Sequence, residues 1–153
     1  MSAAAQYERE IAFLLRQVVI KEQKMEYEVY TVTLPEHPET VMFIQGIVAR
    51  KLAGLLWLWR NALWIKKSNA TADGCVQVKA GICGINEVVL ASYWKDISSL
   101  AKFFKSPPHK KMMQYLSDHP NYLTLYNETY RPSRSGKYVN EPNGLAVIYP
   151  RSG

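Results

Sequence analysis

Cysteine is scarce in this chain of 153 residues. The two cysteines, Cys75 and Cys83, lie in one apolar segment and lack the CxxC spacing. Neither a disulfide scaffold nor a zinc site is therefore expected, and we predict two reduced, buried thiols. The sequence also lacks a phosphate-binding glycine loop, a nucleophile elbow, a metal triad and a dinucleotide fingerprint, so we expect neither a resident metal nor nucleotide-dependent catalysis.

Long apolar runs and blocks of one charge are missing as well. The longest apolar run, residues 52–65, is interrupted by Arg60 and Asn61. It is shorter than the roughly 20 residues that span a bilayer. The first residues do not show the pattern of a secretory signal, so we expect a cytoplasmic protein without a transmembrane segment. The net charge is +6 but no Lys/Arg block carries it, so nucleic acid is not an expected partner.

The composition, with 48% hydrophobic residues, is that of a globular chain with one core. Residues 4–22 show the spacing of an amphipathic helix, and residues 25–34 alternate like an edge strand or an extended arm before Pro35. We therefore treat residues 1–35 as an N-terminal extension. Residues 131–153 combine Pro, Gly and Ser with apolar positions and predict an ordered extension that packs on the core or on a partner subunit.

In the core, residues 36–130, segments with the two-residue hydrophobic period of strands alternate with segments that have helical spacing. The predicted elements are a strand at 41–48, a helix through 52–63, strands at 76–80 and 88–94, a helix capped by Asp96 and resumed at 109–116, and a strand at 122–130. The order βαββαβ predicts an α+β, ferredoxin-like fold in which two helices cover one face of a four-stranded antiparallel sheet. The uncovered face would be apolar and aromatic, which favours a homodimer.

Several sequence features occur together in a specific order. Tyr93-Trp94 ends the third core strand, the segment SPPH stands at 106–109, and Asn127-Glu128-Thr129-Tyr130 precedes Gly136, Tyr138, Pro142, Gly144 and Leu145. Over about residues 40–148 the chain resembles the monooxygenase-like branch of the dimeric α/β-barrel superfamily, the type of the antibiotic-biosynthesis monooxygenases. The resemblance implies a ferredoxin-like protomer, a homodimer, and a pocket between sheet and helices for aromatic or polyketide-like molecules.

Two positions depart from that family's pattern. Asn127 stands where the resemblance implies a histidine before Glu-Thr-Tyr. Met113 stands where haem-degrading relatives carry the axial histidine. The resemblance therefore implies chemistry without a bound cofactor, with haem as the alternative.

Four residues are candidates for catalysis. His109 and Glu128 can serve as a general base, because both side chains accept protons and burial would raise the pKa of the carboxyl. Tyr130 and Asn127 can donate a hydrogen bond to an oxyanion. The alternatives are a capping or surface role for His109, and a salt bridge from Glu128 to Arg131 or Arg134.

Four aromatic residues are candidates for the substrate pocket, because an aromatic ring with a polar tip can pack on a planar molecule and bind its oxygens. They are Trp94, Tyr93, Tyr126 and Trp59. Packing in the core or in a dimer is the alternative. A membrane surface is a further possible partner for Trp57, Trp59 and Trp64, which are flanked by Arg and Lys. The alternative, which the spacing favours, is that at least Trp59 is buried in the core.

The leading hypothesis is a small monooxygenase-like or cyclase-like enzyme that acts without a cofactor on an apolar aromatic or polyketide-like molecule. A pocket base would remove a proton, and the anion would react with oxygen or close a ring. The alternatives are a haem-binding enzyme of the same fold and a dimer that binds an apolar ligand or a protein without catalysis.

Overall fold

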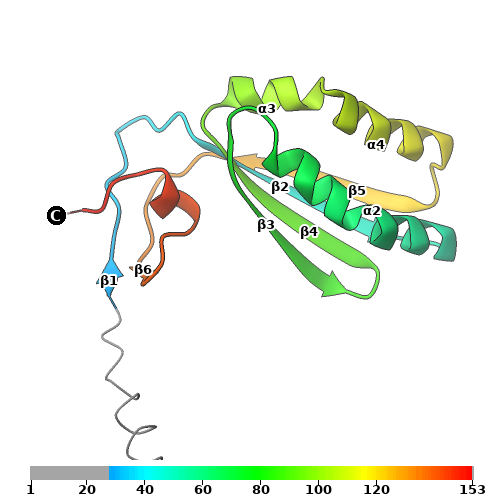
Figure 1. Ribbon diagram of the computed structural model, residues 1–153, viewed down its shortest axis with the longest axis horizontal. Helices are drawn as coiled ribbons and strands as arrows, with labels where there is room; N and C mark the ends of the chain where they lie inside the picture. Colours follow the sequence, from blue (N-terminus) through cyan, green and yellow to red (C-terminus); the bar gives the residue numbers. More distant parts are fainter. Residues whose placement is uncertain (1–27, 153) are drawn as a thin grey trace, which may run out of the picture.

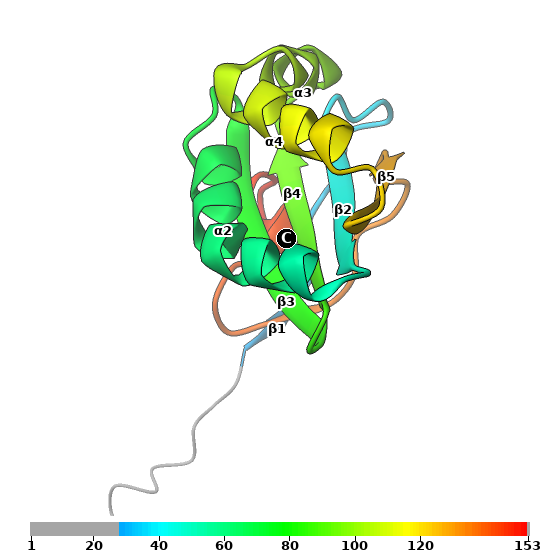
Figure 2. The ribbon, with the colours of Figure 1, turned by 90° about the vertical axis from the view of Figure 1, so that its right-hand side faces the viewer.

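The computed structural model describes residues 28–152. The expected helix at 4–22 lies outside these residues. The core is an antiparallel sheet with the strand order β3-β4-β2-β5, made of β2 (Val41–Ala49), β3 (Cys75–Gly84), β4 (Glu87–Trp94) and β5 (Leu123–Tyr130). The helices α2 (Leu52–Ala70), α3 (Ile97–Phe104) and α4 (Pro107–Asp118) lie on one face (Figures 1 and 2). The predicted α+β class and βαββαβ order are confirmed.

Local capping separates the helices α3 and α4. The carboxylate of Asp96 accepts a hydrogen bond from the Ser99 amide at 2.7 Å, so the predicted cap of α3 is confirmed. Ser106 caps α4 in the same way, and Pro107 and Pro108 occupy its first positions. Proline is well tolerated there because its missing N–H would have no partner. The α4 helix therefore begins at the prolines, not at His109.

The core lies between the sheet and the helices. Neighbouring strand residues point to opposite faces, so every second side chain of β2 and β4 enters this layer. Burying each large apolar side chain contributes about 1.5–3 kcal/mol, so this layer supplies most of the stability. Two clusters fill it, one formed by Val41, Phe43, Trp94, Leu100 and Phe103 and the other by Ile47, Ala49, Leu58, Ile65, Val88, Leu90, Met112 and Leu123.

The edge strand β3 is covered less completely than the central strands. Cys75 is half-buried at its start, and burial raises the pKa of this thiol to about 11. Cys83 is exposed near the β3–β4 turn. The prediction of two buried thiols is therefore wrong for Cys83, which lies where the pairing of this edge strand with β4 becomes irregular, between Ile82 and Gly84.

The segments that flank the core meet beyond one end of the sheet (Figure 1). A short β1 (Val29–Tyr30) pairs with β6 (Tyr138–Val139), followed by the 3₁₀ helix η1 (Gly144–Val147). The ring centroids of Tyr30 and Tyr138 are 5.7 Å apart. The Tyr149 hydroxyl donates to Thr40 Oγ1 at 2.7 Å and ties the C-terminal segment to the start of β2. Within the described residues, β1 is shorter than the alternation at 25–34 predicts.

Candidate functional site

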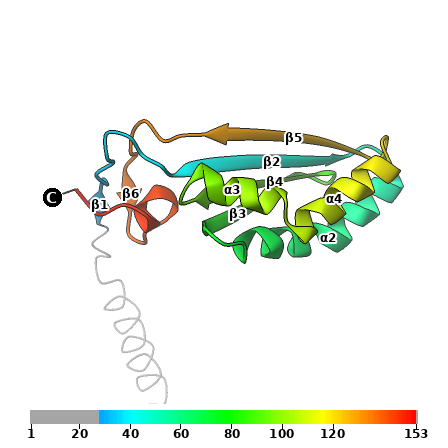
Figure 3. The same cartoon turned by 90° about the horizontal axis from the view of Figure 1, so that it is seen from above.

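The sheet has one face without a helix among the described residues, which we call the open face (Figure 3). Strand register places Met42 beside both Tyr93 and Tyr130, and Tyr93 beside Gln77. These residues therefore share a face, since paired residues in adjacent strands point the same way. Counting every second residue from them gives the rest of the face: Ile44, Gly46, Val48, Lys79, Gly81, Glu87, Val89, Ala91, Thr124, Tyr126 and Glu128.

The C-terminal segment folds over one end of the open face and forms one wall of a cavity of about 460 Å³, which we call the open-face cavity. Three tyrosine rings and three cationic side chains dominate its wall. Aromatic rings with a few convergent polar groups are typical of small-molecule sites. The lining residues are Met42, Lys79, Tyr93, Tyr130, Arg131, Pro132, Arg134, Tyr138, Asn143, Gly144 and Leu145.

Contacts between Asn143-Gly144 and β3 hold this wall in place. Lys79 Nζ donates to Asn143 Oδ1 at 2.6 Å, and the Gly144 amide donates to Gln77 Oε1 at 2.7 Å. Gly144 has a φ of +60°, and a Cβ there would lie 3.0 Å from the Tyr93 hydroxyl oxygen. Glycine is favoured at this position because it adopts positive φ without strain and leaves room for the tyrosine.

Glu128 and Tyr130 form a pair on the open face. The Tyr130 hydroxyl donates to a carboxylate oxygen of Glu128, two residues earlier on the same edge strand. This hydrogen bond, with some desolvation, raises the pKa of Tyr130, so the phenol stays protonated. Glu128 is exposed, because β5 is an edge strand, so the expected burial of its carboxyl is not found. Within residues 28–152 it forms a bond to Tyr130 in place of a salt bridge to Arg131 or Arg134.

Tyr126 also lies on the open face, nearer the β3–β4 turn. Its ring covers Gly46, where an added Cβ would be 2.0 Å from ring atoms Cε1 and Cζ. Its hydroxyl donates to Glu87 at 3.3 Å, and desolvation, followed by this bond, raises its pKa. Tyr126 therefore shares the face with Glu128 and Tyr130 but is not part of the cavity wall.

The remaining sheet candidates lie on the helix-covered face. Trp94 is fully buried, with its indole N–H donating to Ser92 Oγ at 2.9 Å and its ring 5.2 Å from that of Phe103. Asn127 pairs with Gln45 in the register and so points away from Glu128 and Tyr130. The structure therefore does not bring Asn127 and Tyr130 to one oxyanion, and it places Trp94 in the core.

His109 belongs to the helical layer. Its ring lies 5.6 and 5.1 Å from the centroids of Phe103 and Phe104, and burial lowers its pKa. The void beside it measures only about 10 Å³. These surroundings do not fit haem, because they leave no space for a macrocycle against the imidazole. The resemblance places a pocket between sheet and helices, but the cavity of about 460 Å³ lies on the other face.

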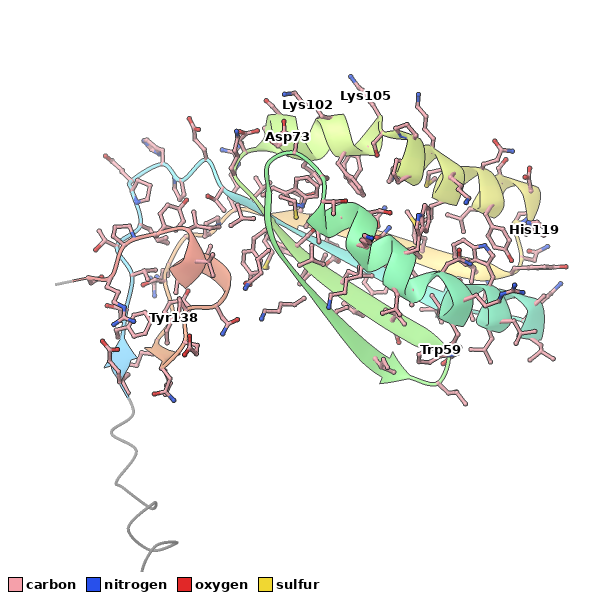
Figure 4. All side chains as sticks on the ribbon, viewed as in Figure 1. Trp59, Asp73, Lys102, Lys105, His119 and Tyr138 are labelled. Atoms are coloured by element: carbon pink, nitrogen blue, oxygen red, sulfur yellow. The ribbon has the colours of Figure 1, made fainter. Side chains whose placement is uncertain are left out.

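Trp59 lies far from the open-face cavity (Figure 4). Its side chain is 42% exposed, and its indole N–H donates to the carbonyl of Ile85 in the β3–β4 turn at 2.9 Å. The burial that the sequence favours for Trp59 is therefore wrong. The helix faces the sheet through Leu58 instead.

Sequence reasoning missed the cationic part of the cavity. Lys79 lies 52 residues before Arg131, and Arg134 follows three residues later. Tyr138 entered the sequence analysis only through its place in the family pattern. Arg131 and Arg134, which the sequence analysis considered only as partners of Glu128, follow β5 closely and are the signal that could have indicated a cationic site at this end of the sheet. Among the described residues, no group of three or more His, Cys, Asp and Glu side chains is arranged to hold a metal ion, and no helix is long and apolar enough to cross a membrane.

Solved structures share this fold at low sequence identity. A variant of SnoaB, a cofactor-independent oxygenase from Streptomyces nogalater, aligns with a TM-score of 0.51 and 12% identity over 63% of this chain and 95% of its own. A candidate antibiotic biosynthesis monooxygenase from Deinococcus radiodurans aligns with a TM-score of 0.50 and 14% identity, over 61% of this chain and 93% of its own. Protein SO0527 from Shewanella oneidensis aligns with a TM-score of 0.52 and 10% identity, over 73% of this chain and 98% of its own. Similarity at this level establishes the fold alone.

Sequence comparison identifies the family. None of the curated proteins compared with the chain matches it. The profile of the monooxygenase af470-like family matches residues 40–144, which include the whole sheet, the three helices and the chain up to Gly144. The chain therefore belongs to the monooxygenase af470-like family.

Proposed function

We propose that the protein is a monooxygenase-type enzyme whose substrate is an oxygen-bearing aromatic anion bound in the open-face cavity. The composition of the cavity wall supports this proposal. Tyr93, Tyr130 and Tyr138 offer ring surface for a planar molecule. Lys79, Arg131 and Arg134 attract an acidic or phenolic oxygen, and guanidinium groups bind carboxylates in a paired geometry.

The Glu128–Tyr130 pair supplies acid–base chemistry next to the cavity. Glu128 takes a proton from a phenol or from an activated CH₂ group of the substrate, and Tyr130, which stays protonated, donates to the oxygen that gains charge. The resulting carbanion adds dioxygen to give a peroxide anion, which takes the proton back from Glu128 and becomes a hydroperoxide. Loss of water from the hydroperoxide leaves a carbonyl, so one oxygen atom enters the product and the other leaves as water.

This scheme needs dioxygen but no bound metal or flavin. The fold shared with SnoaB, which is described as a cofactor-independent oxygenase, is compatible with it. When a carbonyl of the same substrate lies within reach of the carbanion, the same proton transfer leads to ring closure. The two outcomes differ in whether oxygen is consumed.

A homodimer formed through the open faces completes the proposal. Tyr126 and Tyr130 are 39% and 45% exposed on this face, and half-buried apolar side chains lie between them and Tyr93. Covering this surface with a second copy removes apolar area from water. The second sheet would also close the cavity and shield Glu128 from solvent.

The test uses the hydroxylated anthrone dithranol, which has an activated CH₂ between two phenolic rings, and measures oxygen consumption with an electrode. Glu128→Gln should lower turnover by about 10²-fold or more, the contribution expected of a general base. Glu87→Gln is the matched control and should retain turnover, because this carboxylate on the same face accepts from Tyr126 and not from the cavity residue Tyr130. Unchanged oxygen consumption in Glu128→Gln would contradict the mechanism. Tight binding of the anthrone by the parent chain without any conversion would favour a binding protein.

A further inference from the structure

We propose that the outer face of α2 docks on an anionic lipid membrane. The helix exposes four large apolar side chains, which we call the α2 stripe. Leu52 is 71% exposed, Leu56 58%, Trp59 42% and Leu63 81%. Their spacing of four, three and four residues places them on one side of a helix that turns by about 100° per residue.

The opposite side of α2 packs against the sheet. Gly54, Leu58 and Ile65 are buried against the sheet. A helix that is apolar on both sides needs a cover for each of them. The sheet covers one side, and the proposed dimer uses the far face of the sheet. Among residues 28–152, the α2 stripe is therefore left without a cover.

The charges around the α2 stripe indicate what covers it. Arg60 and Lys67 flank the stripe on one side and Lys66 on the other, and α2 contains no acidic residue. Lys51 precedes the helix. Lys and Arg beside exposed Leu and Trp are typical of helices that lie in the interface of an anionic bilayer. A second copy docking stripe to stripe would bring like charges together without a compensating carboxylate, which is unfavourable.

The β3–β4 turn extends the apolar surface. Ile82 and Ile85 are 67% and 78% exposed there. The hydrogen bond from the Trp59 indole to the Ile85 carbonyl, 2.9 Å long, connects the turn to the α2 stripe (Figure 4). Tryptophan is enriched at the membrane–water interface. Helix and turn therefore offer one surface of apolar side chains with a cationic border.

Co-sedimentation with vesicles tests this proposal. The full chain should sediment with vesicles of phosphatidylcholine containing one third phosphatidylserine, and much less with phosphatidylcholine alone or at high salt. The double variant Leu56→Gln/Leu63→Gln should lose about tenfold or more in apparent affinity, and Lys66→Gln/Lys67→Gln about tenfold.

Matched controls come from α3. Ile97 is 45% exposed on α3. Lys102, on the same helix, and Lys105, the residue directly after it, point outward and away from Trp59 (Figure 4). Ile97→Gln and Lys102→Gln/Lys105→Gln should bind vesicles like the parent chain. The proposal is overturned if the parent chain stays in the supernatant with anionic vesicles, or if the α2 and α3 variants behave alike. A fall in the oligomeric state of Leu56→Gln/Leu63→Gln, measured by light scattering, would assign the stripe to self-association instead.

Discussion

The two faces of the sheet use the same strands for different purposes. The helix-covered face is filled by large side chains such as Phe43, Ile47 and Trp94, and the void near His109 measures about 10 Å³. The open face carries polar-tipped rings and the carboxylates of Glu87 and Glu128, and it borders a cavity of about 460 Å³. Since adjacent residues of a strand point to opposite faces, Tyr93 borders the cavity while Trp94 belongs to the core. Within each strand, side chains that face the helices thus contribute to stability, and the alternate side chains that face the cavity are available for chemistry.

The largest expected effect comes from removing the core member of that pair. Trp94→Ala should lower the free energy of unfolding by about 3–5 kcal/mol, because it deletes a fully buried ring. Tyr93→Ala, on the half-buried open side, should cost only about 1 kcal/mol but weaken binding of a hydroxynaphthoate, which carries both an aromatic ring and an acid. Urea denaturation and a fluorescence titration measure the two quantities. Equal destabilisation by both substitutions would break the division between the faces.

A smaller effect is expected where Tyr126 covers Gly46. Gly46→Ala places a methyl group where ring atoms now lie at 2.0 Å, and it should cost about 1–3 kcal/mol of stability. In a Tyr126→Ala background the same substitution should be neutral, or stabilising by about 0.4–1 kcal/mol, because it restricts the unfolded chain. Thermal or urea unfolding of the four proteins gives the coupling. The same cost in both backgrounds would show that the ring does not need the glycine.

The pKa of Tyr130 should respond to loss of the charge on Glu128. The carboxylate of Glu128 raises the pKa of Tyr130 above its ordinary value of 10.0, so Glu128→Gln should lower it toward that value. Ultraviolet difference titration of Tyr130, assigned by comparison with Tyr130→Phe, measures the shift. A Tyr130 titration that is identical in the parent chain and in Glu128→Gln would mean that the two side chains do not interact in solution.

The smallest effect concerns His109. Burial lowers its pKa below 6.5, so the folded chain binds fewer protons than the unfolded chain in that range. Stability should therefore rise with pH up to about 6.5 and be lost toward acid, where the imidazole must become charged between the Phe rings. His109→Gln should flatten this part of the profile, as measured by urea denaturation across pH. Parallel profiles for the two proteins would contradict the burial of this ring.

Local sequence signals predicted the elements well, because caps and periodicity act over a few residues. Asp96 and the change from period two to helical spacing are sufficient for the βαββαβ order. They do not show which face of the sheet each side chain occupies, since that depends on pairing between distant strands. Tyr93 and Trp94 were nevertheless assigned to one pocket, although alternation along a single strand already points neighbours to opposite faces.

The cavity itself was harder to predict. Arg131, Arg134 and Tyr138 reach it through the mostly irregular segment after β5, whose course depends on contacts such as that between Gly144 and Gln77. No periodic pattern encodes such contacts. The exposure of Trp59 was missed for a related reason: its hydrogen bond to Ile85 depends on where the β3–β4 turn ends relative to α2.

An NMR titration with hydroxynaphthoate distinguishes the two faces more directly than any substitution. With the chain labelled with ¹⁵N, the amide signals of Tyr93, Tyr130 and Gly144 should shift as the ligand fills the open-face cavity. Those of Leu100 and His109, behind the sheet, should stay in place. Shifts centred on Leu100 and His109 would contradict the assignment and place the binding site between the sheet and its helices.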